Sequence, residues 1–504
     1  MKTADIAPSD GMSSAPSLSF GSAEGRSYWT SAAFVALLSF ALSLTAQYFH
    51  EFWRDEAHTV LLVESAKNLQ SLRAGQQNTL HPIGYYLIEW IAYLIGGLPL
   101  MKILNAAAVA MGCAAIMLSR GLSTTTRWLI PFSFFPLFQY GAFLRSYSLL
   151  FCLICCYALL NEQKRSPLFR LVVLGLIGQI HLYGLIFAFV LIIIEEWRSF
   201  APQNFSPFSA LPVLALFISG WSILPSRQGN NYDPGGLDRI FYITGQGIFP
   251  SLLPLATFNE IQSLAIGIGG ALYFLIGYIA CRHGGLRLAA ILIGTSAPVL
   301  IQSVLFSYGH RWHASFLWVV LIYAIWIFRI EAKSRFIRLF LPSILFVQVV
   351  SGISAFSRDL FEPYSSSQEV AKFLQSQSAM PKILIGVHSS ANSLGWYNDS
   401  AQSVAAYLPG WKMGNPLTGE EDSLFFAYLE TVAWRDCATA VKELTVFLKS
   451  RGLSSVALIS ASGDELECFP SSKEFEIQGT FVGPGGFDYG EKLTAYIVHR
   501  TSTP

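Results

Sequence analysis

Charged residues are scarce in this chain of 504 residues: Asp, Glu, Lys and Arg make up 13% of it, and 53% is hydrophobic. A soluble globular protein carries about 25% charged residues. The net charge is only +1, so nothing indicates a nucleic-acid partner. The deficit of charge, together with many apolar runs of about 20 residues, places the chain in a membrane.

A cleavable signal peptide is not recognisable either. Residues 1–28 are rich in Ser, Ala, Gly and Pro and hold no apolar run, so we expect a disordered cytoplasmic tail. The first span, near Tyr28 to Tyr48, is too long for a signal-peptide core. It also lacks a basic start followed by a small-residue cleavage site. We therefore interpret it as an uncleaved signal anchor.

Cysteines are few, and their positions separate them into two groups. Five of the seven lie in apolar runs and are expected to be buried free thiols, because free cysteine behaves as a small hydrophobe. These five are Cys113, Cys152, Cys155, Cys156 and Cys281. Cys437 and Cys468 lie near the C-terminus and can form a disulfide if that region faces an oxidising compartment.

Hydropathy predicts a polytopic α-helical membrane region over residues 29–356, with about 11–13 transmembrane helices. No internal repeat relates its two halves. Three of the expected spans matter below: 82–98, 100–119 and 127–143.

The distribution of Lys and Arg predicts the topology. Basic residues collect in several loops between later spans, which places those loops in the cytoplasm. Residues 226–260 and everything after about 357 then lie outside. About twelve spans can be drawn, but an even number cannot also place the loop after the first span outside. We prefer an odd number, with one segment between 81 and 127 missed, merged or re-entrant.

Residues 357–504 differ in character from the rest. The stretches "PKILIGVHSS", "SSVALIS" and "LTAYIVHR" are short, apolar and rich in β-branched residues, which predicts strands. The stretch "CATAVKELTVFLKSRG" predicts an amphipathic helix that ends at Gly452. We expect a small, soluble, extracytoplasmic α/β domain.

One polar cluster follows the first span directly, in the segment "EFWRDEAHTV" (51–60). The cluster consists of Arg54, Asp55, Glu56 and His58, beside Trp53. An interfacial stop explains some charge here, but it explains less well why two adjacent carboxylates accompany an Arg and a His. The following "LLVESAKNLQSLRAG" has the spacing of a helix lying on the membrane surface. His81 and Pro82 then open the next span.

The order of these features resembles the GT-C membrane glycosyltransferases. The resemblance is to the group of dolichyl-phosphate-mannose protein mannosyltransferases and lipid A aminoarabinose transferases. The matching stretches are "RDEAH" (54–58), "HPIGYY" (81–86), "LRSYSLL" (144–150) and "QIHLYGLIFA" (179–188). The resemblance covers residues 29–200 and weakens over 200–356, where only the hydropathy pattern carries over. The C-terminal domain matches only in position.

The resemblance implies transfer of a sugar from a polyprenyl-phosphate donor to a hydroxyl of a lipid, glycan or protein. The reaction would occur at the extracytoplasmic face of a bacterial inner membrane, within a catalytic first loop at about 49–81. An acceptor hydroxyl is a poor nucleophile and benefits from a carboxylate that takes its proton. Asp55 is the candidate base, and Glu56 orients it or the acceptor, or the two exchange roles. A single inverting displacement requires no covalent intermediate.

The leaving phosphate needs positive charge and hydrogen-bond donors. The candidates for binding it are Arg145, Tyr147, His310 and Arg311. The supporting or acceptor-side candidates are Arg54, His58, His81, His181 and His313. Arg145 could instead snorkel to lipid headgroups, "GHRWH" (309–313) could be an interfacial turn, and His181 could bond a neighbouring helix.

Three questions stay open at this level. His58 and His81, with Asp55 or Glu56, offer ligand types for a divalent metal. The polar loop at 226–247 could cover a cavity or could be a solvated connection. A lipid or polysaccharide transporter, a flippase and a non-catalytic GT-C-like scaffold are the rival functions. A transporter is disfavoured because the charged cluster lies in a loop and not near mid-span.

Overall fold

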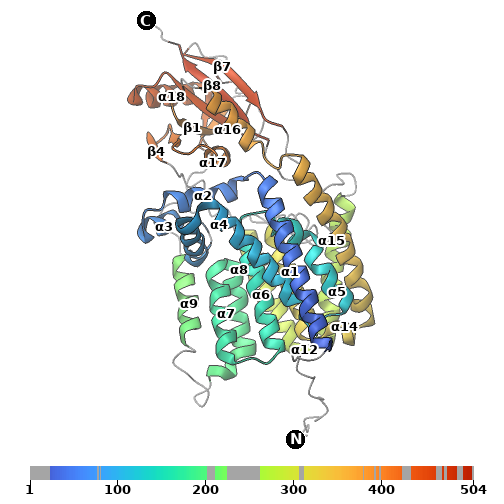
Figure 1. Ribbon diagram of the computed structural model, residues 1–504. Coiled ribbons are helices and arrows are strands. Elements are labelled where there is room, and N and C mark those ends of the chain that lie inside the picture. Colours follow the sequence, from blue (N-terminus) through green and yellow to red (C-terminus); the bar gives the residue numbers. More distant parts are fainter. Residues whose placement is uncertain are drawn as a thin grey trace, which may run out of the picture.

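The computed structural model describes most of the chain, and Figure 1 shows a helical bundle with a smaller sheet domain at one end. The described residues are 23–76, 79, 81–200, 210–223, 262–305, 311–377, 380–390, 393–396, 399–422, 433–460, 468–469, 474–484 and 492–501. The end of the bundle that carries the sheet domain is called the sheet end below.

Apolar helices form the bundle, as the composition predicts. Among the described residues, four helices are long and apolar enough to cross a membrane: α1 (Ala23–Phe49), α4 (Ile83–Met117), α12 (Gln262–Leu305) and α15 (Arg335–Phe361). Shorter apolar helices pack between them: α6 (Ser146–Glu162), α7 (Pro167–Ile180), α8 (Leu182–Leu191), α9 (Ala210–Ser222) and α13 (Arg311–Ile327). The predicted fold class, a polytopic helical membrane protein with a C-terminal α/β region, is confirmed.

The first and last long helices end side by side. His50, just after α1, lies 3.0 Å from Asp359 near the end of α15, measured from Nδ1 to Oδ1. Both helices therefore run toward the sheet end. An odd number of crossings follows, in agreement with the preferred topology.

The segment expected to span at 82–98 does not cross the bundle. Trp90 Nε1 donates to the carbonyl oxygen of Ala66 at 3.0 Å, and Lys102 Nζ donates to that of Gln47 near the end of α1. Both ends of the segment therefore lie at the sheet end. The helix breaks at Gly97, where φ is 62°, and the crossing follows the break. Hydropathy does not separate this segment from a true span, because burial under neighbouring helices also favours apolar residues.

The span expected at 127–143 crosses the bundle without being one helix. It consists of α5 (Thr124–Leu129), a 3-10 turn (Ile130–Phe132) and a π-helical turn (Phe135–Gln139). Pro131 and Pro136 each remove a backbone donor, which disfavours a continuous helix.

A mixed sheet forms the core of the C-terminal region. The order of its main path is β4-β3-β1-β6-β8-β7, and β2 and β5 extend it beside β1. The strands are β1 (Ile383–Ser390), β2 (Ser393–Trp396), β3 (Lys412–Asn415), β4 (Glu420–Asp422), β5 (Ala433–Asp436), β6 (Ser455–Ser460), β7 (Phe475–Val482) and β8 (Thr494–Arg500). β1 pairs in parallel with β3 and β6, and the remaining pairs are antiparallel. The three expected strands are present as β1, β6 and β8.

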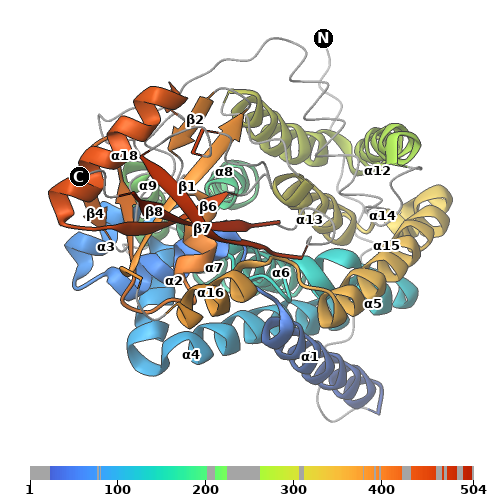
Figure 2. The same cartoon turned by 90° about the horizontal axis from the view of Figure 1, so that it is seen from above.

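Three helices accompany the sheet: α16 (Ser367–Ser376), α17 (Asp399–Ala405) and α18 (Cys437–Arg451). As predicted, α18 ends at Gly452, which takes the left-handed conformation with φ 65°. α17 packs against α2 (Arg54–Ser65) of the bundle. In Figure 2, viewed from the sheet end, the sheet lies over α2 and leaves α1, α12 and α15 uncovered.

A disulfide, which the sequence left open, is present between Cys437 and Cys468, and the other five cysteines are free. The bond closes a loop with a sequence separation of 31 residues. Cys437→Ser should lower the free energy of unfolding of the sheet domain by about 3–4 kcal/mol, because an open loop gives the unfolded chain more entropy. Thermal unfolding of the full-length protein in detergent measures this effect. Cys281→Ser is the control, and equal behaviour of the two variants would contradict the prediction.

Candidate active site

The polar cluster after the first span forms the first turn of α2 at the sheet end. Trp53, with extended backbone, precedes the helix, and Glu56 Oε2 accepts from the Trp53 N–H at 3.2 Å. This contact satisfies one of the backbone donors that every helix start leaves open. It also turns Glu56 into the protein, whereas Asp55, one residue earlier, stays partly exposed.

Asp55 and Arg145 form the central ion pair of the site. Arg145 Nη1 donates to Asp55 Oδ2 at 2.6 Å, and the two side chains are only 11% and 17% exposed. Arg54 Nε lies 3.8 Å from the other Asp55 oxygen. The Arg145 guanidinium also lies over the rings of Trp53 and Tyr147, 5.7 Å and 5.5 Å from their centroids. These contacts orient the cation through both charge and aromatic faces.

A small pocket lies against Arg145. Its lining residues are Trp53, Phe138, Gln139, Phe143, Arg145, Tyr147 and Tyr364. Gln139 Oε1 is buried and has no hydrogen-bond partner within the described residues. The pocket therefore combines a guanidinium, a phenol and a carboxamide with aromatic walls, which is a typical composition for a small-ligand site.

Glu56 occupies a different environment from Asp55. Its side chain is fully buried, and Oε1 accepts from the Leu144 N–H at 2.7 Å. Oε2 lies 2.9 Å from His50 Nε2. Since the carboxylate is enclosed by these partners, Asp55 is the carboxylate of the pair that solvent or a substrate can reach.

Three of the candidate histidines, His58, His81 and His181, lie in one region around this pair. The His81 and His181 rings are 4.6 Å apart between centroids, and the Tyr147 ring is 5.0 Å from His181. His181 Nδ1 accepts from the Tyr183 N–H at 3.0 Å, which caps the start of α8. Through this contact His181 has a structural role. The alternative considered above, a bond to a neighbouring helix, was also a structural role.

Burial keeps the histidines near α2 neutral. Burial lowers the pKa of His58 to about 4, although Asp55 and a hydrogen bond with Gln402 oppose the shift. Burial also lowers the pKa of His81 to about 3, with a further contribution from Arg145. At pH 7 both rings are neutral hydrogen-bonding groups, so Arg145 supplies positive charge here and His58 and His81 do not.

Other candidates lie outside the part of the chain that the structure describes. These candidates are His310, the loop at 226–247 and the side chains of Arg311 and His313. The backbone of Arg311 begins α13, whose other end is far from the site, where Trp326 Nε1 donates to Glu162. Within the described residues, no group of three or more His, Cys, Asp or Glu side chains is arranged to hold a metal ion.

Several residues of this region had no sequence signal. The Tyr407 hydroxyl accepts from the Phe52 N–H at 2.8 Å, and Gln402 of α17 bonds His58. These contacts bring the C-terminal domain to the edge of the site. His50 stands next to the polar cluster and could have been added to it on charge alone, but Gln139, Gln402 and Tyr407 lie in ordinary contexts.

The fold and the site together define a polytopic membrane protein whose carboxylate–arginine pair lies at one end of the bundle, beneath an α/β domain. The chain is similar to arabinofuranosyltransferase AftD from Mycobacteria, with a TM-score of 0.44 and 14% identity over 94% of this chain and 40% of that one. It is also similar to ArnT from Cupriavidus metallidurans in the apo state, with a TM-score of 0.40 and 14% identity over 94% and 98% of the two chains.

The GT-C glycosyltransferases named in the sequence resemblance include both of these neighbours. The chain spans only 40% of the length of AftD. No family model matches the chain, and no curated protein matches it. Similarity this weak assigns no substrate and no residue role, so the function below is argued from the site.

Proposed function

We propose that this protein is a glycosyltransferase that moves a sugar from a polyprenyl-phosphate donor to an acceptor hydroxyl at the extracytoplasmic membrane face. The observation that carries the proposal is the contact of 2.6 Å between Asp55 and Arg145 beside a pocket. The pair joins the two groups that such a transfer needs, a base for the hydroxyl and a cation for the phosphate.

The two groups act on different reactants. A donor phosphate that binds the Arg145 guanidinium competes with Asp55 for it, which frees the carboxylate. Asp55 then accepts the proton of the acceptor hydroxyl, whose oxygen attacks the anomeric carbon. The bond between that carbon and the phosphate oxygen breaks with inversion, and the departing polyprenyl phosphate keeps the electron pair.

The remaining site residues support this step. Arg145 and Tyr147 bind the phosphate in this proposal, and His310 and Arg311 stay as the sequence candidates for further contacts with it. Arg54 holds the second oxygen of Asp55. His58, His81 and His181 supply hydrogen bonds on the acceptor side, with His313. The identities of the sugar and the acceptor depend on loops beyond these residues.

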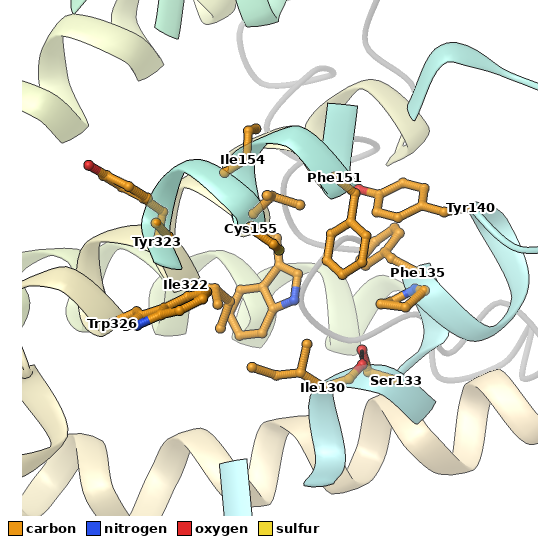
Figure 3. Close-up of a pocket in the computed structure, with 14 residues that line it drawn as sticks. Ile130, Ser133, Phe135, Tyr140, Phe151, Ile154, Cys155, Ile322, Tyr323 and Trp326 are labelled. Atoms are coloured by element: carbon orange, nitrogen blue, oxygen red, sulfur yellow. Dashed lines mark hydrogen bonds between the residues drawn. The ribbon is translucent and has the colours of Figure 1, made fainter. Parts of the chain in front are cut away.

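A second pocket suits the lipid part of such a donor. It lies between α6, α13 and the irregular segment at 130–140. Figure 3 shows the side chains of its wall, among them the rings of Phe135, Tyr140, Phe151 and Trp326. Tyr140 of this wall stacks on Tyr147 of the polar pocket, with centroids 6.0 Å apart. We propose that isoprenoid units occupy this pocket while the phosphate lies at Arg145.

Filling the apolar pocket should impair long-chain donors selectively. Ala158→Leu adds carbon atoms to its wall. The KM for a long-chain donor should rise about tenfold, because apolar contact area is lost, while the KM for a donor of two isoprenoid units stays unchanged. Ala188→Leu, an equally buried alanine outside the pocket, is the control. An equal rise for both donors would contradict this assignment.

The orientation follows from charge. Lys164 and Arg165 lie between α6 and α7, at the end of the bundle opposite the sheet, which assigns that end to the cytoplasm under the positive-inside rule. The disulfide supports an oxidising compartment for the sheet domain. We propose a bacterial inner membrane with the sheet domain and the first loop outside.

Lipid analysis of a deletion strain tests the proposal. Without the protein, one polyprenyl-phosphate sugar should accumulate. Wild-type protein should clear it, and Asp55→Asn should not. A transporter or flippase would keep substrate movement in the Asp55→Asn variant, and an inactive scaffold would show no transfer even unmutated. Either result would replace the present proposal.

A further inference from the structure

Three titratable side chains form a continuous buried chain behind the site. His50 Nε2 lies 2.9 Å from Glu56 Oε2, and His50 Nδ1 lies 3.0 Å from both oxygens of Asp359. Each of the three side chains is about 1% exposed. This chain of Glu56, His50 and Asp359 is called the buried relay below.

The hydrogen bonds of the relay define its protonation. Ionised carboxylates only accept hydrogen bonds, so an imidazole between two of them must donate from both ring nitrogens. A neutral ring would turn the lone pair of one nitrogen toward one of the two carboxylates, which is an unfavourable contact in a dry environment. Burial lowers the pKa of His50, but Asp359 and Glu56 more than offset this effect and raise it to about 10. The ring is therefore a cation at neutral pH.

The relay connects four segments of the chain. His50 follows α1, Glu56 lies in the first turn of α2, and Asp359 lies at the end of α15, which leads into the sheet domain. Glu56 Oε1 extends the relay to the Leu144 N–H, one residue before Arg145. Glu56 also directly follows Asp55. One buried carboxylate therefore contacts the backbone beside both members of the ion pair.

We propose that the buried relay is a positioning device for sugar transfer. In it, His50 and Asp359 hold Glu56, and Glu56 keeps Asp55 and Arg145 in contact with each other. The inference rests on the proposed function. None of its members touches a reactant, and they act through the backbone of α2 and of residues 144–145. A misplacement of reacting groups by about 1 Å can cost about 100-fold in rate, so such support has kinetic consequences.

The surroundings of His50 contain few other charges. The rings of Phe143 and Tyr364 flank it at 4.4 Å and 4.9 Å between centroids. Glu51 interacts with it electrostatically, and Lys102 interacts with Glu56. Glu51 is itself held protonated near neutral pH, because burial and Glu369 raise its pKa to about 8. Asp359 and Glu56 are therefore the groups that set the charge of the ring.

Kinetics of the full-length protein with Asp359→Asn test the relay. The variant keeps the shape of the side chain and removes one charge. We expect kcat to fall about 10–100-fold, the range seen when groups that orient a ligand are replaced, and KM for the donor to change less than about twofold. Glu362→Gln, a carboxylate three residues further on that is half exposed in an ion pair with Arg358, is the matched control and should behave as wild type.

The pH dependence separates positioning from a merely structural role. The folded pKa of His50 is raised, so the relay is intact below it and is lost as pH rises through about 10. Wild-type kcat should fall across that range. In Asp359→Asn the fall should begin at lower pH, since one stabilising carboxylate is gone. His50→Gln should remove this step altogether.

Three results would overturn the relay. They are a wild-type kcat that stays level through pH 10.5, an Asp359→Asn variant with the wild-type profile, and equal losses in Asp359→Asn and Glu362→Gln. The wild-type profile requires no variant to fold, so a variant that fails to fold does not prevent the test. A wild-type protein without any transfer would instead overturn the proposed function.

Discussion

Replacing Asp55 with Asn should lower the rate of sugar transfer by about 10²–10⁴-fold, the usual contribution of a general base. The amide keeps the shape of the side chain and its place beside Arg145, but it cannot accept a proton from the acceptor hydroxyl. The KM for the donor should not rise, because the phosphate site is retained and the phosphate no longer competes with a carboxylate for Arg145. Initial rates with a purified polyprenyl-phosphate sugar measure both parameters.

Glu64→Gln provides the control for this result. Glu64 lies on the same helix, is exposed, and is nine residues from the ion pair along the chain. It should retain wild-type transfer. Thermal unfolding in detergent should show the Asp55 variant to be folded. An Asp55→Asn variant with more than a tenth of the wild-type rate would exclude a carboxylate base at this position.

Replacing Arg145 with Gln should reduce kcat/KM by about 10²–10³-fold, the loss expected when one donor to a developing negative charge is removed. The loss should appear in both parameters, since the guanidinium binds the phosphate in the ground state and as it departs. Arg145→Lys keeps the charge but not the planar fork that binds a phosphate through two bonds, so it should recover only part of the activity. Donor binding, measured separately from turnover, distinguishes the two contributions.

The matched control is Arg165→Gln. Arg165 is exposed at the opposite end of the bundle, where it bonds Gln163, and its loss should leave transfer unchanged. If Arg145→Gln bound the donor with wild-type affinity and turned over normally, the phosphate would have to bind elsewhere. The segment 309–313 would then be the next candidate for the phosphate-binding site.

The ion pair also explains how the protein without substrate tolerates two charged side chains in a nearly enclosed place. A cation of 11% exposure and a carboxylate of 17% exposure neutralise each other until a substrate separates them. An unpaired charge in so enclosed a place would be costly. The ion pair thus keeps both groups charged and ready without leaving either one alone.

Local patterns in the sequence predicted the elements that depend on nearest neighbours. Low charge and long apolar runs predicted the membrane bundle, and β-branched stretches predicted β1, β6 and β8. The polar cluster at the start of α2 predicted the region in which we propose the site. Each of these depends on the periodicity or composition of a few turns of chain, which a sequence states directly.

Local patterns failed where an apolar helix does not cross the bundle. The first half of α4 packs one face against α2 and leaves Ile91, Leu94 and Ile95 exposed, and hydropathy scores both faces like a span. Glu56 and Asp55 are adjacent and chemically alike, yet one is enclosed and the other reachable. The direction in which each side chain points depends on the way α2 packs, so the composition of the segment does not predict it.

What the sequence determined by itself is therefore the membrane class, the presence of the C-terminal α/β domain and the region of the site. The tertiary structure alone decided which groups meet. Asp55 contacts Arg145 across 90 residues of chain, and His50 contacts Asp359 across 309. Such contacts arise from the packing of whole helices, and a local pattern carries no information about which distant helix will lie beside it.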